Sequence, residues 1–537
     1  MIRPSKKDFD IVFQNNLDIK VDVLVLNQNG TAIGNINGSV INCSSSIDST
    51  SDIRRTFNLE MQVNSDTFNL LNDTSIVWLD KEFVIKVAIF NYSTQEYQYY
   101  PQGSYFAIDG SVKYDATSHA LSTSLVDKVA KLNGDLGGIL GGFIQYTLPC
   151  IKNKEEIKNE TVYEYYTISE TIRTVLNDLS LSDYYIGEFG ELKGLPCYNK
   201  NYISYRKENN NWDKLPYDLE FQNGVSGYEV IKKIINLYPN NVAYYNENGI
   251  FFCKNYNSNN IEEVILDIDF FEKIIIDENA KIDFTSIKNI SEVWGKPIDM
   301  SKDRYSENCI LENNIYKVTI DGMESYGNNN LIAIKIPSSN PENVMIQINN
   351  LNTIYVYDLD TDDYLNKNTL DENITYIFKY KNEKFYYMCK FQPHAIDVLS
   401  DGTTLPLPSK TYEKYSVEYF KDKYICQKVN ISISKDSPFT VQKIGEILDV
   451  KSGEDYENAW SDYEAMEWAK YENAINSRQN DTITITTSIV PWLDVDIIVR
   501  YKSLHNDQIN KYIIKKIDHD FLNGTDTITM YRYYEEI

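Results

Sequence analysis

Residues 56–63 read TFNLEMQV, and this stretch decides the fold class of the N-terminal part of the chain. Apolar residues occupy every second position, at Phe57, Leu59, Met61 and Val63. Because successive side chains of a strand point to opposite faces, this spacing predicts a β-strand with one buried face. Residues 21–26, 83–89 and 104–108 have the composition of further short strands separated by turns. Several short strands of this kind indicate a barrel or a sandwich.

The composition excludes some classes of function. A chain of 537 residues predicts three or four domains, at roughly 150 residues each. The net charge of -26 repels DNA, RNA and anionic lipid, which argues against a nucleic-acid-binding protein. The sequence has no run of 18 apolar residues, and its N-terminus has no signal-peptide pattern, so neither a membrane span nor a leader is expected. The seven cysteines are dispersed, which predicts reduced, mostly buried thiols.

The middle of the chain changes to a helical period. A glycine cluster over residues 134–142 predicts a flexible or tightly turned junction, and two capping boxes follow, at Thr167–Glu170 and Ser226–Glu229. Each capping box precedes apolar residues at helical spacing. Asn248-Gly249 between two apolar runs predicts a β-hairpin. Residues 150–280 are therefore expected to form a small α+β domain.

The second half of the chain is again rich in strand-forming residues. One or two strands are expected over residues 281–296, and a separate β domain over about 310–410. Residues 461–479 predict a helix with Trp468 on its buried side. Four strands are then expected, over residues 482–487, 495–501, 512–518 and 527–533, with turns at 491–493 and 523–524.

No motif in the sequence carries a recognisable chemistry. His519 stands between two aspartates, but a solvated or interface histidine is favoured over an acid–base group. Residues 358–363 resemble the start of a Ca²⁺ loop, yet Asp363 replaces its glycine and Thr369 its final glutamate, which indicates an acidic surface turn. The glycine cluster is followed by Phe143 and not by Lys-Ser, so it does not fit a phosphate-binding loop. The prediction is a chain with no catalytic, cofactor-binding or metal-binding residues.

A family resemblance is carried by residues 54–59, 78–83, 100–106, 227–234, 243–252 and 491–496. They form three groups that resemble the phage tail hub family, which includes the central baseplate proteins of contractile tails and related tail-tip proteins. The first is RRTFNL, WLDKEF and YPQGSYF at 54–59, 78–83 and 100–106, which looks like the first tube-like barrel of hubs from phages of low-GC Gram-positive hosts. The second is GYEVIKKI at 227–234 with the hairpin over 243–252, similar to the family's helix–hairpin domain. The third is PWLDVD at 491–496, which resembles the start of a second tube-like barrel.

The resemblance implies a multidomain, β-rich α+β fold, with two tail-tube-like β-barrels at the chain ends. The expected parts are barrel I (1–132), a glycine-rich junction (133–149), the α+β domain (150–280), connecting strands (281–300), an inserted β domain (301–410) and barrel II (411–537).

The resemblance also implies a structural role without enzymatic activity. A homotrimer of such hubs would join the sixfold tail tube to a threefold spike or tip and nucleate tube assembly. Implied partners are the tail tube protein, distal tail or baseplate wedge proteins, the spike or tip protein and the tape-measure protein, with genomic DNA passing through unbound. The location would be the virion tail, after assembly in the host cytoplasm. Two alternatives stay open: a receptor- or carbohydrate-binding tail protein with residues 310–410 as the binding module, and a tail-associated cell-wall hydrolase.

Overall fold

The structure is a computed structural model of the whole chain. It describes residues 4–35, 40–62, 79–108, 113–115, 117, 119–141, 145–157, 160–187, 189, 214–215, 218–237, 241–255, 268–294, 298–299, 305–320, 322–327, 330–358, 361–390, 397–398, 404–405, 410–411, 414–416, 439, 441–451, 456, 472, 476, 481–505 and 508–533.

The N-terminal strands form one half of a 13-stranded sheet. The expected strands are confirmed, and TFNLEMQV lies in β4 apart from Val63, which is outside the described residues. Phe57, Leu59 and Met61 are buried there, as their alternation requires. The strands of this half are β1 (Ile19–Leu26), β2 (Ala32–Asn35), β3 (Val40–Asp48), β4 (Arg55–Gln62), β5 (Glu82–Asn91), β6 (Glu96–Phe106), β7 (Lys113–Asp115) and β8 (Ala120–Asp127). Helix α1 (Lys6–Val12) buries Ile11 and Val12 against them.

The C-terminal strands form the other half of the same sheet. All four strands expected after residue 480 are confirmed, with the Asn523-Gly524 turn between the last two. These strands are β32 (Asp481–Ser488), β33 (Ile498–Lys502), β34 (Ile509–Asp520) and β35 (Thr525–Arg532). A strand from mid-chain, β16 (Ile275–Ile282), pairs with β32. Helix α5 (Ile268–Ile274) packs against this half, with the ring of Phe271 5.7 Å from that of Tyr501.

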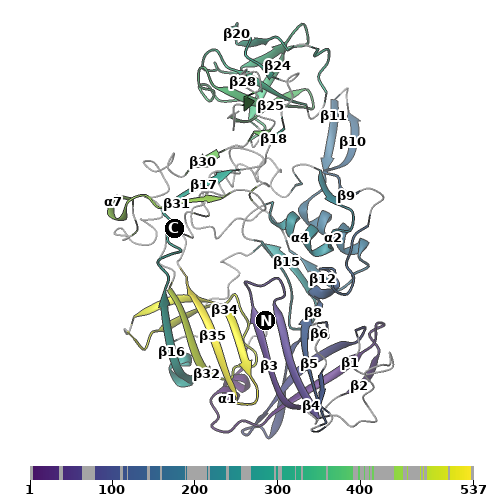
Figure 1. Cartoon of the computed structure of the whole chain (residues 1–537), viewed down its shortest axis with the longest axis vertical. Coiled ribbons are helices and arrows are strands. Elements are labelled where there is room, and N and C mark those ends of the chain that lie inside the picture. Colours follow the sequence, from purple (N-terminus) through teal and green to yellow (C-terminus); the bar gives the residue numbers. More distant parts are fainter. Residues whose placement is uncertain are drawn as a thin grey trace.

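The two ends of the chain are joined by direct strand pairing. Strand β3 pairs antiparallel with β34, so that Ser45 lies opposite His519. The strand order runs β16-β32-β35-β34-β3-β4-β8-β6-β5-β1-β2, with β33 beside β34 and β7 beside β8 (Figure 1). One apolar core serves both halves, in which the rings of Phe57 and Phe521 stack at 5.9 Å. The β-rich fold class is therefore as expected, and the two ends share one sheet.

The α+β segment packs around its own apolar core, above the sheet in Figure 1. Both predicted capping boxes are confirmed: Thr167 caps α2 (Ile168–Asp178) and Ser226 caps α4 (Gly227–Ile235). The predicted hairpin is formed by β14 (Asn241–Tyr245) and β15 (Phe251–Asn255), with Gly249 at positive φ in its turn. The other elements are η1 (Lys128–Lys131), β9 (Gln145–Leu148), β10 (Ile151–Ile157), β11 (Glu160–Tyr165), β12 (Tyr184–Ile186) and β13 (Leu219–Gln222).

An eight-stranded sheet with a separate core lies at the far end of the long axis from the large sheet (Figure 1). It contains β19 (Tyr305–Ser306), β20 (Cys309–Glu312), β21 (Ile315–Val318), β22 (Leu331–Lys335), β23 (Met345–Ile348), β24 (Ile354–Asp358), β25 (Thr375–Lys381) and β26 (Lys384–Lys390). The β character predicted for this part of the sequence is confirmed.

Short elements connect these parts. They are β17 (Ile290–Trp294), β18 (Ile298–Asp299), β27 (Asp397–Val398), β28 (Thr404–Leu405), β29 (Lys410–Thr411), β30 (Lys414–Ser416), α7 (Val441–Ile444) and β31 (Leu448–Lys451). The strands expected over 281–296 correspond to the end of β16 and to β17. Of the helix predicted over 461–479, only Glu472 and Asn476 are described, and both are helical; Trp468 lies outside the described residues. No helix in the described ranges is long and apolar enough to cross a membrane.

Candidate functional site: a polar sheet face and the junction behind it

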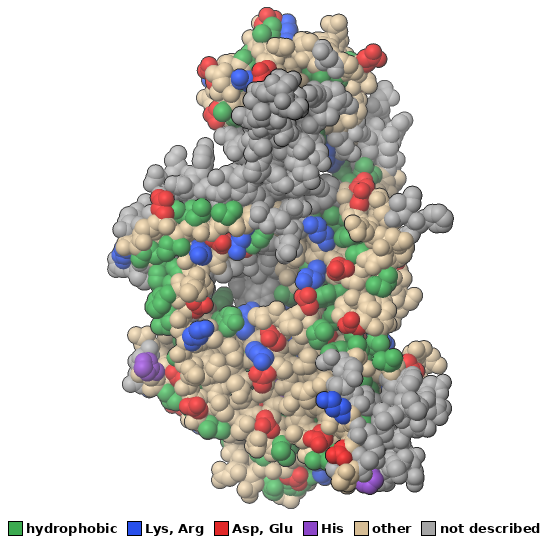
Figure 2. Space-filling model, in the orientation of Figure 1, with side chains coloured by type: hydrophobic (Ala, Val, Ile, Leu, Met, Phe, Trp, Pro, Cys, Tyr) green, Lys and Arg blue, Asp and Glu red, His purple; other side chains and the backbone are tan. Residues whose placement is uncertain are grey.

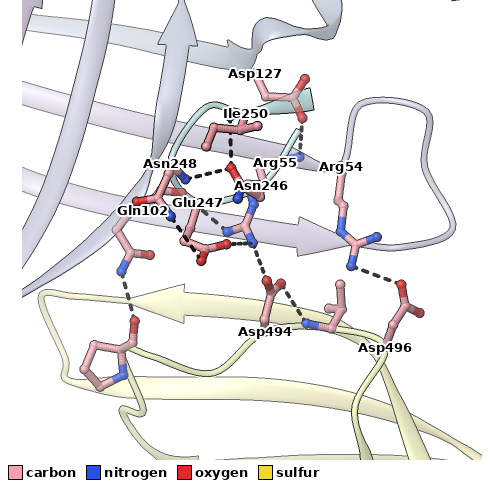
Figure 3. Close-up of polar contacts among 12 residues, drawn as sticks. Arg54, Arg55, Gln102, Asp127, Asn246, Glu247, Asn248, Ile250, Asp494 and Asp496 are labelled. Atoms are coloured by element: carbon pink, nitrogen blue, oxygen red, sulfur yellow. Dashed lines mark hydrogen bonds and ion pairs between the residues drawn. The ribbon is translucent and has the colours of Figure 1, made fainter. Parts of the chain in front are cut away.

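A buried arginine, Arg55, connects three segments of the chain (Figure 3). It is the first residue of β4, and its guanidinium lies 2.7 Å from Asp494, which precedes β33. The same guanidinium lies 4.0 Å from Glu247, in the turn of the β14–β15 hairpin. Its backbone N–H donates to Asp127 at the end of β8. Because Arg55 is only 2% exposed, these contacts fix the relative position of both halves of the sheet and the hairpin.

The neighbouring Arg54 repeats this connection. Its guanidinium lies 3.0 Å from Asp496 and 3.9 Å from the ring centroid of Tyr244 on β14. Lys515 on β34 also pairs with Asp496, at 2.9 Å. Asp496 has a positive φ of 63°, a conformation that aspartate tolerates better than most residues. Two adjacent arginines therefore join the N-terminal strands to the loop 491–497, which lies between β32 and β33.

The charges at this junction perturb one another. Burial alone would lower the pKa of Arg55, but the combined attraction of Asp494, Glu247, Asp127 and the Tyr105 hydroxyl outweighs it and raises that pKa. Burial would likewise raise the pKa of Asp494, but Arg55 and Arg54 hold it below its ordinary value. Asp127 behaves differently, since burial raises its pKa to about 6 despite two backbone N–H donors. The junction holds the Arg55–Asp494 pair charged at neutral pH.

The large sheet presents a polar face made from both ends of the chain, called the hydroxyl face below. Its residues alternate with buried ones along each strand, and cross-strand pairing aligns them into rows. Members of the hydroxyl face are Ser122 and Ser124 on β8, Thr56 and Asn58 on β4, Ser44 and Ser46 on β3, Asp518 on β34, Thr527 and Thr529 on β35, and Thr484 and Thr486 on β32. Small hydroxyl and amide side chains thus come from five strands, and Asp518 on β34 lies among them.

Hydrogen bonds run along the hydroxyl face from strand to strand. Ser124 donates to Asn58 at 2.9 Å, and Ser46 donates to Asp518 at 2.6 Å across the pairing of β3 with β34. Lys516 pairs with Asp518 at 2.9 Å. Figure 2 shows the area over β3, β34, β35 and β32 as mainly uncharged polar, with scattered acidic and basic side chains. A shallow groove of about 260 Å³ lies on this face over β3, β4 and β8, bordered by Glu60 and Lys113.

The prediction of a solvated or interface position for His519 is wrong. It is 1% exposed and lies behind the hydroxyl face, where its Nδ1 is 2.6 Å from the carboxylate of Asp526. Asp526 also accepts a hydrogen bond from the backbone N–H of Val490. The residue is buried because it lies between Ile517 and Phe521 on the core-facing side of the sheet, an alternation with Asp518 and Asp520 that is visible in the local sequence.

The acidic turn and the glycine cluster singled out in the sequence both contact other parts of the protein. The acidic turn after β24 binds its own protein neighbours, since Asp362 accepts hydrogen bonds from Lys384 and Tyr386. In the glycine cluster, Gly138 has a φ of +75°, and a Cβ there would lie 2.3 Å from the carbonyl oxygen of Lys131. Of the two alternatives, a flexible or a tightly turned junction, this geometry favours the tight turn at Gly138. The described cysteines Cys43, Cys150, Cys253 and Cys309 are free, and all except Cys150 are buried.

In the described part of the chain, no three His, Cys, Asp or Glu side chains lie close enough to hold a metal ion. The sequence did not single out Arg54, Arg55, Asp494 or Asp496 as a cluster. In the sequence, the two arginines are adjacent and the two aspartates are two positions apart, each pair in a strand-like segment. This local pattern does not identify their partners.

Several solved structures match nearly the whole chain. They include the 43 kDa tail protein of prophage MuSo2 from Shewanella oneidensis, at 8% identity, a TM-score of 0.44, and coverage of 96% of this chain and 98% of that one. The prophage tail protein gp18 from Listeria monocytogenes matches at 9% identity and a TM-score of 0.41, covering 95% and 94%. A tail protein from Neisseria meningitidis matches at 8% identity and a TM-score of 0.42, covering 96% of each chain.

This chain resembles phage tail proteins. One family model, described as a domain of unknown function (DUF5048), matches residues 436–537. No curated protein matches the sequence.

Proposed function

We propose that this chain is the structural hub of a phage or phage-derived tail, placed where the tail tube meets the spike or tip. The observation that carries the proposal is the single sheet built from both ends of the chain, with the hydroxyl face on one side and a shared core on the other. The two halves of this sheet contain the strands of the proposed tube-like barrels I and II, over 1–132 and 411–537, and β16 from mid-chain adds an edge strand to the second. Residues 133–149, 150–280, 281–300 and 301–410 form the junction, α+β, connecting and inserted parts between them.

The chemistry of the hydroxyl face suits the wall of a passage for DNA. Each lysine or arginine that binds a phosphate releases counterions, so several such contacts would hold the DNA strongly. Short side chains such as Ser46 and Thr529 offer no fixed positive charge, and Lys516 is paired with Asp518. A wall of this kind lets a polyanion slide.

A homotrimer of this hub would present six barrels to the sixfold tube, and its threefold symmetry would match that of the spike. The acidic charge of each chain opposes association, so the contacts between copies must be apolar or locally complementary. Edge strand β16 offers such a surface, with Ile276 61% exposed and Phe284, just beyond it, 68% exposed. The tube protein, wedge or distal tail proteins, spike protein and tape-measure protein are the proposed partners in the virion tail.

We also propose that the chain has no enzymatic activity of its own. The junction cluster consists of closed ion pairs, and His519 is buried beneath the sheet face. Purified protein should therefore hydrolyse neither peptidoglycan, nucleic acids nor esters. Cell-wall lysis that a single histidine or carboxylate substitution abolishes would contradict this proposal.

Charge placed on the hydroxyl face tests its proposed role. Asn58→Lys and Thr529→Lys add one positive charge to each half of the sheet, and both should slow the release of DNA from assembled particles. The delay should weaken as salt is raised. Ile310→Lys, at a position 55% exposed on the inserted domain, is the matched control and should release DNA at the wild-type rate. Equal delays in all three variants would show that the face does not meet DNA.

A further inference from the structure

Three tyrosines lie on one face of the inserted eight-stranded sheet. Strands β24 and β26 are parallel neighbours, with Tyr357 opposite Tyr386. Tyr355 stands two residues before Tyr357 and therefore points to the same side. The alternate residue Val356 is fully buried in the core on the opposite side. These tyrosines consequently face away from the core of the domain.

The chain then turns and places a fourth tyrosine over this face. Tyr364 forms an isolated β-bridge with Tyr357, and their rings stack at 5.0 Å and 28°. The ring of Tyr364 meets that of Tyr355 at 5.1 Å and 64°. Tyr355 is 41% exposed and Tyr364 45% exposed. Two accessible rings at a steep angle form a corner, called the tyrosine corner below.

Polar contacts fix Tyr357 and Tyr386, the two sheet tyrosines next to the tyrosine corner. The ammonium of Lys384 lies 4.3 Å from the ring centroid of Tyr357, on which Tyr364 stacks. Asp362 accepts hydrogen bonds from Lys384 at 2.9 Å and from the hydroxyl of Tyr386 at 2.7 Å. Because the supporting side chains are tied to one another, little side-chain freedom would be lost when a ligand binds to the corner.

We propose that the tyrosine corner binds an uncharged carbohydrate. A sugar ring has an apolar face of C–H groups, which stacks on an aromatic ring, and a rim of hydroxyls, which suits the phenol groups beside it. A cationic ligand is disfavoured because Lys384 already lies against Tyr357, and an anionic ligand because the chain carries a net charge of -26.

The position of the corner agrees with a surface-binding role. The domain that carries it lies at the opposite end of the long axis from the large sheet (Figure 1). A ligand bound there would therefore lie far from the large sheet. This inference goes beyond the structural role proposed above and does not depend on it.

The proposal is tested by binding the full-length protein to an array of uncharged and acidic oligosaccharides. The oligosaccharide that binds most strongly is then titrated. The wild type should retain one or more uncharged saccharides. Tyr355→Ala and Tyr364→Ala should each weaken the affinity by about tenfold, the loss expected for one aromatic contact. Tyr364→Phe keeps the ring and should bind nearly as the wild type does. Tyr185→Ala, at a tyrosine 51% exposed on β12, is the matched control and should have no effect.

Each other result counts against the proposal. Retention of no saccharide, retention of acidic saccharides alone, or an affinity that both alanine variants leave unchanged would overturn it. The circular dichroism spectrum of each variant shows whether it is folded, and Tyr364→Phe separates loss of stacking from loss of structure. Threefold assembly is measured on the same samples. A chain that binds saccharide without forming trimers would contradict the hub and leave this inference standing.

Discussion

Arg55 and Asp494 are 439 residues apart in the sequence, and their side chains meet at 2.7 Å beneath the seam between the two halves of the sheet. The pair is almost completely buried, so each charge depends on the other for compensation. This contact adds to the pairing of β3 with β34, which joins the two ends of the chain.

Removal of one partner of this pair should be severely destabilising. Arg55→Ala leaves Asp494 buried without its cation, and we expect a loss of about 3–5 kcal/mol in the free energy of unfolding. Chemical denaturation measures it. Lys317→Ala, which breaks an exposed ion pair with Glu312, is the control and should cost about 0–1 kcal/mol. Similar losses in the two variants would show that the junction does not hold the sheet together.

Asp127 should give the stability a distinctive dependence on pH. Its folded pKa of about 6 lies above the unfolded value of 3.8, so the folded chain binds more protons between these values. Stability should therefore fall as pH rises from about 4 to about 6, by roughly 3 kcal/mol from this group. Asp127→Asn should flatten that part of the profile. An unchanged slope in the variant would mean that Asp127 is ionised throughout this range.

The glycine-rich junction allows a matched comparison within one short segment. Gly138→Ala introduces a Cβ against Lys131 and Leu132 at a positive φ, and should cost more than about 1 kcal/mol. Gly141→Ala has open space around its new Cβ and should change the thermal midpoint little. Equal midpoints for the two variants would contradict the tightly packed turn.

Burial should protect the thiols of the folded protein. It raises the pKa of Cys43 and of Cys309 to about 12, and that of Cys253 as well. Thiolate is the reactive form, so an alkylating reagent at neutral pH should modify these residues slowly before denaturation and completely afterwards. Mass spectrometry of the alkylated peptides provides the measurement. A disulfide between Cys197 and Cys253 would contradict the prediction of seven reduced cysteines.

Local features of the fold were predictable, whereas its long-range connections were not. Alternation identified the buried face of β4, and the capping residue Thr167 marked the start of α2, because both signals lie within a few residues. The partner of a strand is not encoded in its alternation, which specifies a face and leaves the neighbour open. The pairing of β3 with β34 therefore appeared only in the structure.

The same limit applies to the candidate sites. Ser46 and Thr529 are ordinary strand residues in the sequence, and the hydroxyl face emerges when pairing aligns them across the sheet. Tyr355 and Tyr364 lie in a sequence rich in tyrosine, where an exposed ring and a core ring have the same local pattern. Only the turn that returns Tyr364 to Tyr357 distinguishes them.

The most direct test of the hub proposal is a cryo-electron-microscopy map of the assembled particle. We expect three copies of the chain around the tail axis, with the hydroxyl face of both halves of the sheet lining the passage and few unpaired basic side chains exposed to it. A single copy, a sixfold ring, or a sheet whose hydroxyl face points away from the passage would contradict the proposal.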